Sequence, residues 1–249
     1  MSILINHNIS ELLNKKMILT ANNFIKSQIQ PASLDLTLSS NCYRIKASFI
    51  PNNKNVSQLI ESLTLSKINL NNENLLEKNC IYLCELNESL NLSNIFSAKS
   101  NPKSTTGRLD IFTRLITDNG KEYDVVDKGY KGKLYLEIIP QSFSIIIKKG
   151  LSLNQIRFYK DDQIVNSFVR SQDISIYIKK NQICAYKAKK NTGAINLSKL
   201  NHYKISEFWE AIIPKNNNFI IEKDAFYILR SLENIRIEDT MAAELEPFG

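Results

Sequence analysis

The segment KSTTGRLDIFTRLITD, residues 103–118, places small hydroxyl side chains, a glycine and an arginine directly before an alternating, strand-like run. Within it, Ser104 offers a hydroxyl and Arg108 a permanent positive charge. A later apolar run, LYLEII, holds one isolated acid, Glu137. The chain has only two histidines, which argues against histidine-based nucleophilic catalysis and histidine-ligated metals. Any hydrolytic chemistry would therefore use carboxylates and water.

Each of these residues also has an ordinary structural interpretation. Ser104 could cap a helix, and Arg108 could form a surface or interface ion pair. Strand alternation places Tyr135 and Glu137 on one face and the neighbouring leucines on the other. The leucines then face the core, so this pattern alone favours a surface position for Glu137.

Composition limits the class of protein. A chain of 249 residues without a long apolar run or a signal-like start is expected to be soluble and cytoplasmic, with no membrane partner. Its four cysteines lie in apolar runs, which favours buried thiols over a disulfide framework. The net charge of +7 comes from scattered lysines without a nucleic-acid-binding motif, so we expect a solvated surface and no nucleic acid partner.

Short strand-like runs separated by turns dominate the chain. They are PASLDLTL, CYRIKASFI, KNCIYLCEL, LDIFTRLIT, GKLYLEII, SFSIIIKKG and SLNQIRFYK. Only residues 9–16 and 56–63 are typical of helices. Because no long helices alternate with the strands, we expect a mainly β antiparallel sandwich or jelly roll.

The chain contains one internal repeat. Residues 77–102 align without a gap on residues 222–247, with identical residues at both ends of the window. Duplication explains this better than chance similarity between two hairpins. We therefore predict one complete β domain over residues 1–190 and the start of an incomplete second copy over residues 191–249, with part of its apolar surface uncovered.

Four motifs occur in an order that resembles the dCTP deaminase and dUTPase superfamily. They are QPASLDLTLS (30–39), KSTTGRLDIFTRLITD (103–118), VVDKGYKGKLYLEI (125–138) and KKGLSLNQIRF (148–158). The similarity is greatest to the long, tandem-domain form of dCTP deaminase. It implies a dUTPase-like jelly-roll or β-clip barrel in a trimer-like homo-oligomer, with active sites between neighbouring copies. It also implies Mg²⁺ carried with the nucleotide triphosphate and no protein-bound zinc.

The resemblance also implies roles for individual residues. The predicted catalytic residues are the general base Glu137, its charged neighbour Arg108, and the groups that hold the reactive water, Ser104 and the carbonyl of Thr117. The predicted substrate-binding residues are Lys103, Thr105, Asp127, Tyr130 and Gln155. Lys103 departs from the family pattern, which has an arginine at that position, so a forked guanidinium is replaced by a point charge.

The implied reaction is hydrolysis of dCTP to dUTP and ammonia. Asp127 in VVDKGY also resembles the acid of the dUTPase turn, so a dUTPase or a bifunctional enzyme stays open. The deaminase requires the strand carboxylate Glu137, which simple dUTPases generally lack. Because the second copy is incomplete, an inactive nucleotide-binding relic is the third possibility.

Overall fold

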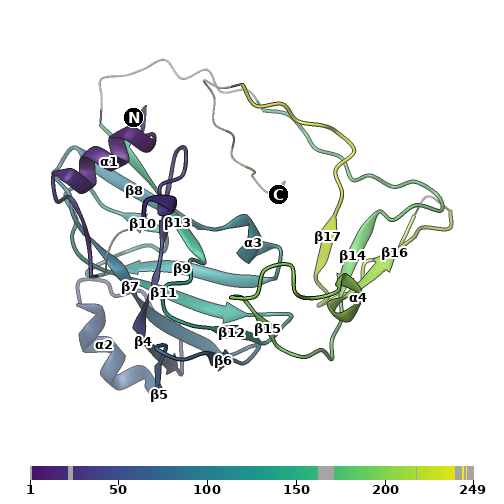
Figure 1. Cartoon of the computed structure of the whole chain (residues 1–249), viewed down its shortest axis with the longest axis horizontal. Helices are drawn as coiled ribbons and strands as arrows, with labels where there is room; N and C mark the ends of the chain where they lie inside the picture. Colours follow the sequence, from purple (N-terminus) through teal and green to yellow (C-terminus); the bar gives the residue numbers. More distant parts are fainter. Residues whose placement is uncertain are drawn as a thin grey trace. The chain divides into compact units, whose positions relative to one another are not determined.

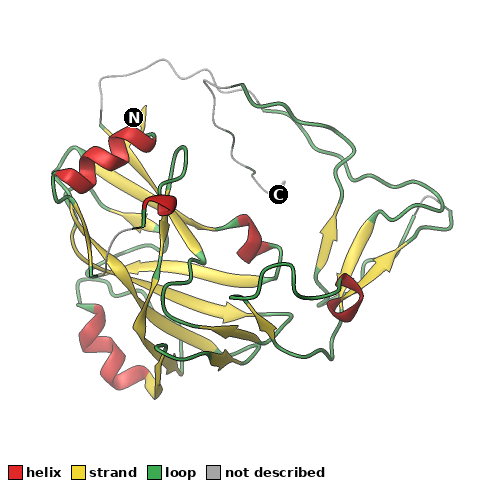
Figure 2. Cartoon of the chain, viewed as in Figure 1, coloured by secondary structure: helices red, strands yellow, loops and turns green. Residues whose placement is uncertain are grey.

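The computed structural model describes residues 2–21, 25–161, 171–216, 218–238, 243 and 245. Strands dominate these residues and the helices are short, so the predicted mainly β fold is confirmed (Figure 2). The chain divides into two compact units, one of Met1–Ser167 with Lys190–Tyr203 and one of Phe168–Lys189 with Lys204–Gly249. Among the described residues, no helix is long and apolar enough to cross a membrane.

The described strands of the first unit form three sheets (Figure 1). One contains β1 (Ser2–Ile3), β3 (Leu34–Leu36), β8 (Phe96–Pro102), β10 (Val125–Val126) and β13 (Asn154–Lys160). The largest contains β2 (Ile18–Thr20), β4 (Leu38–Ile45), β5 (Thr64–Asn69), β7 (Ile81–Asn91), β9 (Ile111–Thr117) and β11 (Lys131–Pro140). The smallest contains β6 (Asn74–Leu76), β12 (Ile145–Ile147) and β15 (Ile195–Asn196). All their pairings are antiparallel except that of β12 with β15, as expected for a sandwich assembled from local hairpins.

The main core lies between the two larger sheets. Ala98 and Ile156 from one sheet and Leu115 and Leu136 from the other belong to the same buried cluster. Alternation along β11 directs Leu136 and its even-numbered neighbours into this cluster, as the sequence predicts. The sandwich therefore fixes the facing direction of every side chain on β11.

The opposite face of β11 is also covered. Tyr135 packs in a second buried cluster with Val56 and Ile60 of helix α2 (Val56–Leu63). Glu137 shares this face and has no exposed surface, so the surface position favoured by alternation alone is wrong. The physical reason is that side chains and α2 cover a face that the sequence pattern leaves open to solvent.

The remaining described helices of the first unit are short. They are α1 (Asn6–Asn14), the 3₁₀ turn η1 (Lys26–Gln28) and α3 (Ser104–Gly107). The two predicted helices correspond to α1 and α2. Asp118 Oδ1 accepts the Val56 N–H at 2.7 Å, which satisfies one backbone donor at the start of α2. This bond ties α2 to the end of β9.

The second unit repeats the strand order of the first. Its described elements are β14 (Ala185–Ala188), α4 (Ile205–Phe208), β16 (Trp209–Ile212) and β17 (Tyr227–Leu229). The order β16-β14-β17 matches β5-β4-β7, and α4 leads directly into β16 as α2 leads into β5. The predicted duplication therefore extends to the topology of the sheet.

A tyrosine corner is present in both copies at the positions that the sequence repeat aligns. The Glu77 N–H donates to Tyr82 Oη at 2.9 Å, and the Glu222 N–H donates to Tyr227 Oη at 3.1 Å. Each turn also holds one left-handed residue at matched positions, Asn79 (φ 61°) and Asp224 (φ 59°). The carboxylate of each glutamate pairs with a cation on the middle strand of the matched trio, Arg44 of β4 with Glu77 and Lys187 of β14 with Glu222.

A second shared contact shows where the second copy begins. The Thr37 N–H donates to Glu88 Oε2, and the Ser175 N–H donates to Glu233 Oε2, both at 2.8 Å. These residues end the similar segments SLDLT and SQDIS, of which the second starts at residue 171. The second copy therefore starts well before the predicted boundary at residue 190.

The boundary between the two units therefore differs from the one that the sequence predicts. Strand β14, which the prediction assigns to the first domain, pairs with β16 and β17 of the second unit. Strand β15, assigned to the second domain, pairs with β12 of the first unit. A division at residue 190 would separate both strands from their hydrogen-bonding partners.

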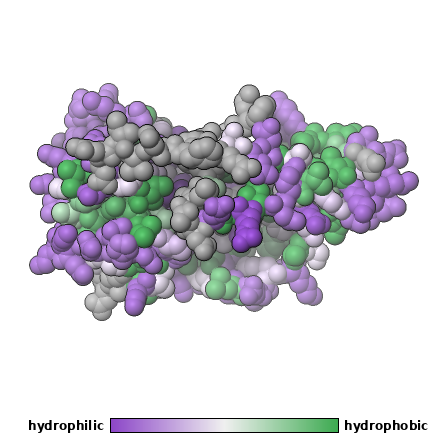
Figure 3. Space-filling model, turned by 90° about the horizontal axis from the view of Figure 1, so that it is seen from above, coloured by the Kyte–Doolittle hydropathy of each residue, from purple (hydrophilic) through white to green (hydrophobic). Residues whose placement is uncertain are grey.

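The second copy exposes side chains whose counterparts are buried in the first. Leu90 and Leu92 are buried, whereas the matched Ile235 and Ile237 are 49% and 52% exposed. Figure 3 shows apolar patches among the polar side chains of the surface. In the first copy β8, β11 and β13 help to bury the equivalent positions, and no described strand of the second unit takes their place. The predicted exposure is confirmed for Ile235 and Ile237, whereas Phe226 and Ile228, also predicted to be uncovered, are half-buried.

The paired carboxylates predict unequal contributions to stability. Glu88 is buried and accepts three hydrogen bonds, two from Thr37 and one from Gln28 Nε2. Glu88→Ala leaves these donors unpaired, so we expect a loss of about 2–4 kcal/mol in the free energy of unfolding. The matched control Glu233→Ala removes a partly exposed carboxylate and should change the free energy of unfolding by less than about 0.5 kcal/mol. Urea unfolding followed by circular dichroism measures both, and equal effects would contradict the assignment of the first carboxylate as a core group.

Candidate functional site

Helix α3 presents the hydroxyl-rich segment at the surface. Thr106 is buried and anchors the turn, because its Oγ1 donates to the Leu153 carbonyl at 2.7 Å. Ser104, Thr105 and Arg108 are exposed. No capping hydrogen bond is made by a side chain at the start of α3, where the N-cap residue precedes Ser104. The cap interpretation of Ser104 therefore finds no support, and its hydroxyl is accessible.

Lys103 and Gln155 both lie next to a buried acid, Asp35. The ammonium of Lys103 pairs with Asp35 Oδ2, and Gln155 lies opposite Asp35 in the pairing of β13 with β3. Gln155 Oε1 also accepts the Ser33 hydroxyl at 2.9 Å. The fold thus brings two predicted phosphate contacts together. It also supplies Asp35, a carboxylate that would compete with a phosphate for Lys103.

Glu137 is held by an arginine that the sequence analysis did not select. In the pairing of β11 with β9, Glu137 lies opposite Arg114. Its Oε1 accepts from Arg114 Nε at 2.8 Å and from Nη2 at 2.5 Å. Its Oε2 is buried and makes no hydrogen bond with any described residue.

The predicted neighbour of Glu137 was Arg108, and the structure does not bring these two together. The Arg108 side chain makes no hydrogen bond or ion pair with the described part of the chain, and Arg114 takes the expected place. The signal for Arg114 was its isolation in the apolar run IFTRLIT, similar to the isolation of Glu137 in LYLEII. Which strand residues face each other depends on a register that one sequence does not reveal.

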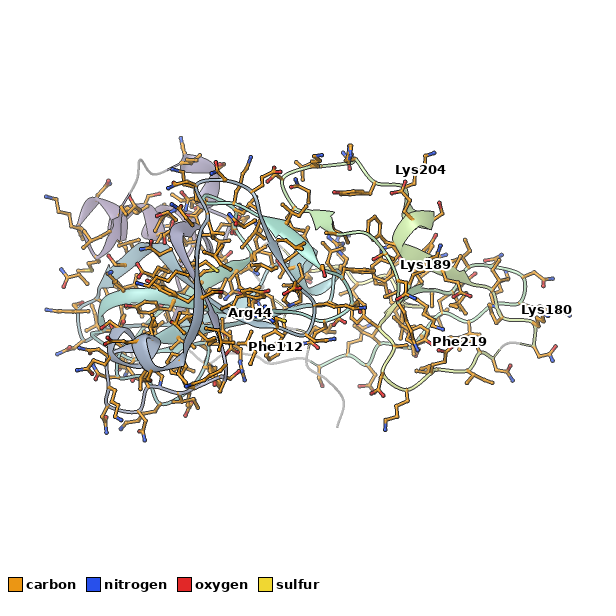
Figure 4. All side chains as sticks on the ribbon, turned by 90° about the horizontal axis from the view of Figure 1, so that it is seen from below. Arg44, Phe112, Lys180, Lys189, Lys204 and Phe219 are labelled. Atoms are coloured by element: carbon orange, nitrogen blue, oxygen red, sulfur yellow. The ribbon has the colours of Figure 1, made fainter. Side chains whose placement is uncertain are left out.

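Aromatic rings fix the Arg114 guanidinium. Its Cζ lies 3.9 Å from the ring centroid of Tyr123 and 5.0 Å from that of Phe112, both within the range of cation–π contacts. Phe112 itself is 46% exposed and lies in the first unit (Figure 4). The aromatic rings and Glu137 leave the guanidinium little freedom to move.

A pocket of about 390 Å³ opens beside Arg114. Its wall consists of residues from the end of β8, from α3, from β9 and from three loops: Pro102, Gly107, Asp110, Ile111, Phe112, Thr113, Arg114, Asp124 and Gln141. A Cβ added to Gly107 would meet no atom within 4 Å, so packing within the chain does not require a glycine there. The pocket connects the turn of α3 with the arginine that binds Glu137.

Asp124 is the second carboxylate close to Arg114. Its Oδ1 accepts the Leu115 N–H at 2.8 Å, and its backbone φ of 62° is left-handed. Burial raises the pKa of Asp124 from 3.8 to about 6, although the Leu115 N–H and Arg114 act in the opposite direction. This carboxyl therefore changes its charge near neutral pH.

The other predicted site residues lie on the turns that flank β9 and β11. Thr117 is buried and its carbonyl accepts the Gly120 N–H at 3.1 Å, which leaves one lone pair for a further donor. Tyr130 Oη accepts the Asp118 N–H and donates to the Lys133 carbonyl, and burial raises the pKa of Tyr130. These contacts make Tyr130 a support of the turn.

Asp127 is exposed, like Ser104, Thr105 and Arg108. Its carbonyl accepts the Tyr130 N–H at 3.2 Å. No described contact joins these exposed residues to Glu137. Among the described residues, no three His, Cys, Asp or Glu side chains form a group that could hold a metal ion.

Comparisons with known proteins cover both units. The family model for the 2′-deoxycytidine 5′-triphosphate deaminase (DCD) N-terminal domain matches residues 1–162, and the model for the C-terminal domain matches residues 154–249. The chain is similar to a crystal structure of 2′-deoxycytidine 5′-triphosphate deaminase from Agrobacterium tumefaciens, with 35% identity and a TM-score of 0.87. That match covers 92% of this chain and 74% of the other. The comparison with curated proteins gave no match.

The raised pKa of Asp124 predicts a pH-dependent contribution to stability. Between pH 3.8 and about 6 the folded protein keeps a proton that the unfolded chain releases, so this contribution falls as the pH rises. Asp124→Asn keeps an oxygen acceptor for the Leu115 N–H and removes the buried charge. We expect the variant to be more stable than the unchanged chain by about 2 kcal/mol at pH 7 and equally stable at pH 4. Urea unfolding at the two pH values measures this, and a difference independent of pH would refute it.

Proposed function

Because the chain belongs to the 2′-deoxycytidine 5′-triphosphate deaminase family, we propose that it deaminates dCTP with a water molecule activated by Glu137. The observation that carries this proposal is the buried carboxylate on β11, bound by arginine through Oε1 alone. A general base must be ionised and must have an oxygen available for the proton that it takes. The contact with the positively charged Arg114 stabilises the ionised form of Glu137, and Oε2 is the oxygen available to accept the proton.

The proposed reaction consumes one water and releases one ammonia. Glu137 takes a proton from the water, and the resulting hydroxide adds to C4 of the cytosine ring. The proton passes to N3, so C4 becomes tetrahedral and carries both the hydroxyl and the amino group. The same carboxyl then moves the hydroxyl proton to the amino group, ammonia leaves, and dUTP remains. Glu137 thus acts first as base and then as acid.

The remaining site residues bind the water and the nucleotide. The Ser104 hydroxyl and the Thr117 carbonyl hold the water, and Asp127 accepts the sugar 3′-hydroxyl. Lys103, Thr105 and Gln155 bind the triphosphate, which carries Mg²⁺ with it. A phosphate close to Lys103 would replace Asp35 as its partner, since both are anions. Tyr130 keeps the turn of Asp127 in place through its hydroxyl contacts.

We further propose that neighbouring copies complete each site in a trimer-like homo-oligomer. Ser104 and Arg108 are exposed and have no described contact with Glu137 of the same chain. Side chains that face solvent on one copy can reach the accessible part of Arg114, the partner of Glu137, on another copy across an interface. Arg108 would then approach the reacting group in the assembled protein, as the family resemblance implies.

The first test is the reaction itself. Purified protein is incubated with dCTP and Mg²⁺, and dUTP, dUMP and ammonia are quantified. Equal amounts of dUTP and ammonia support the deaminase, whereas dUMP with ammonia identifies a bifunctional enzyme. Conversion of added dUTP to dUMP without ammonia from dCTP identifies a dUTPase, and no product from either nucleotide supports the inactive relic.

Glu137→Gln should lower kcat for ammonia release by roughly 10²- to 10⁴-fold, because an amide keeps the shape but cannot accept the proton. Triphosphate binding, measured by calorimetry, should be retained. Glu85→Gln is the matched control, since that acid lies on the neighbouring strand β7 and pairs with Lys133. Near-normal turnover in the Glu137 variant would remove the proposed base.

Mixing two inactive variants tests the shared site. Arg108→Ala and Glu137→Gln chains are unfolded together, refolded and assayed. If neighbouring copies share a site, some mixed interfaces carry both intact residues, and activity returns to roughly a quarter of the unchanged level on random assembly of equal amounts. Activity that stays at the level of the separate variants would show that each site belongs to one chain.

A further inference from the structure

Glu137 is buried at a cost that one neighbouring cation offsets. The carboxylate has no exposed surface and lies among the apolar residues 134–140 of β11. Burial disfavours the charged form of an acid unless an opposite charge or hydrogen bonds compensate. Among the described residues, the cation that contacts this carboxylate is Arg114. Arg114 is therefore the described group that offsets the cost of burying a charge at Glu137.

The geometry of the pair is asymmetric. In a common arginine–carboxylate fork, two N–H groups meet two different oxygens. Here Arg114 Nε and Nη2 both donate to Oε1 of Glu137, and Oε2 receives neither. The contact supplies charge while leaving the second oxygen for another partner.

The guanidinium is itself fixed. Tyr123 and Phe112 contact it through their rings, and the β9–β11 register sets the strand position from which it projects. Arg114 also forms part of the pocket wall beside α3. Its side chain is 21% exposed, so it links the buried carboxylate to accessible surface.

We propose that Arg114 is a positioning residue that keeps Glu137 ionised and directs Oε2 toward the reactants. This rests in part on the proposed deamination, because it assigns Glu137 the role of base. The chemical requirement is a planar cation with two converging N–H groups. Lysine supplies the charge but neither the fork nor the same ring contacts.

Two other titratable groups influence the pair. Asp124 and Tyr123, from the segment before β10, interact electrostatically with both Arg114 and Glu137. The residue of β7 opposite Glu137 is the uncharged Leu83. Since Asp124 titrates near pH 6, kinetic profiles are best recorded in an Asp124→Asn background, in which this group cannot produce the acidic limb.

The first measurement does not depend on activity. Infrared difference spectra between chains with and without Glu137→Gln isolate the Glu137 carboxyl band at pH 7. We expect the band of an ionised carboxylate in the protein that retains Arg114 and in Arg114→Lys. In Arg114→Met we expect the band of a protonated carboxyl group. An ionised band in all three overturns the proposal, even if the protein proves not to deaminate dCTP.

The second measurement is the pH dependence of ammonia release from dCTP. Arg114→Met should lower kcat roughly 100-fold with KM changed by less than about threefold, and should move the acidic limb of kcat upward by about one pH unit or more. Arg114→Lys should return the acidic limb of kcat to the pH found in the unchanged protein, but should restore only part of the value of kcat. Arg44→Met, which removes another partly exposed arginine paired with a glutamate, should change neither.

These results separate the two proposals. If the unchanged protein does not release ammonia but the infrared bands follow Arg114, the proposed function fails and the electrostatic role stands. If ammonia is released and Arg114→Met keeps the unchanged pH profile, the role of Arg114 is refuted. If Arg114→Met does not fold, the lysine variant still decides, because full kcat in Arg114→Lys would exclude the need for a fork.

Discussion

The first unit is organised around a buried acid on a central strand. Placing Glu137 without exposed surface on β11 requires a cation from the adjacent strand, and the antiparallel register supplies Arg114 opposite it. That register is itself fixed by the leucines that point into the sandwich core and by α2 on the other face. A slip by one residue would turn the acid into the apolar core and the leucines outward. Packing and site geometry are therefore consequences of the same strand alignment.

The two units show which parts of this arrangement are local. The tyrosine corner, the cation–glutamate pair and the carboxylate that binds a strand N–H occur in both copies. These contacts join neighbouring strands and do not need the opposite sheet. The Arg114–Glu137 pair belongs to strands whose equivalents are not found among the described residues of the second unit. Among its described residues, the second copy thus retains the corner of the fold without counterparts of β9 and β11.

Much of the fold could be predicted from the sequence, because the relevant signals are local. Strands such as β7, β9 and β11 and helix α2 follow from alternation and from short periodic runs. Long-range pairings were missed. The Lys103–Asp35 contact joins residues 68 positions apart, and the partner of Glu137 depends on strand register. The start of the second copy was missed because the two copies do not keep a constant spacing. The offset that aligns SQDIS with SLDLT differs from the offset that aligns the two tyrosine corners, so a gapless alignment detects only the corner.

One feature of the proposed reaction can be observed directly: Oε2 of Glu137 would face the reacting carbon while Oε1 stays bound to Arg114. A crystal structure of the Glu137→Gln protein with dCTP and Mg²⁺ would show this geometry in a complex that does not turn over. The account predicts a water over C4 of the cytosine, within about 2.6–3.2 Å of the side-chain atom that replaces Oε2. A cytosine ring bound away from this side chain, with its water held by other groups, would contradict it.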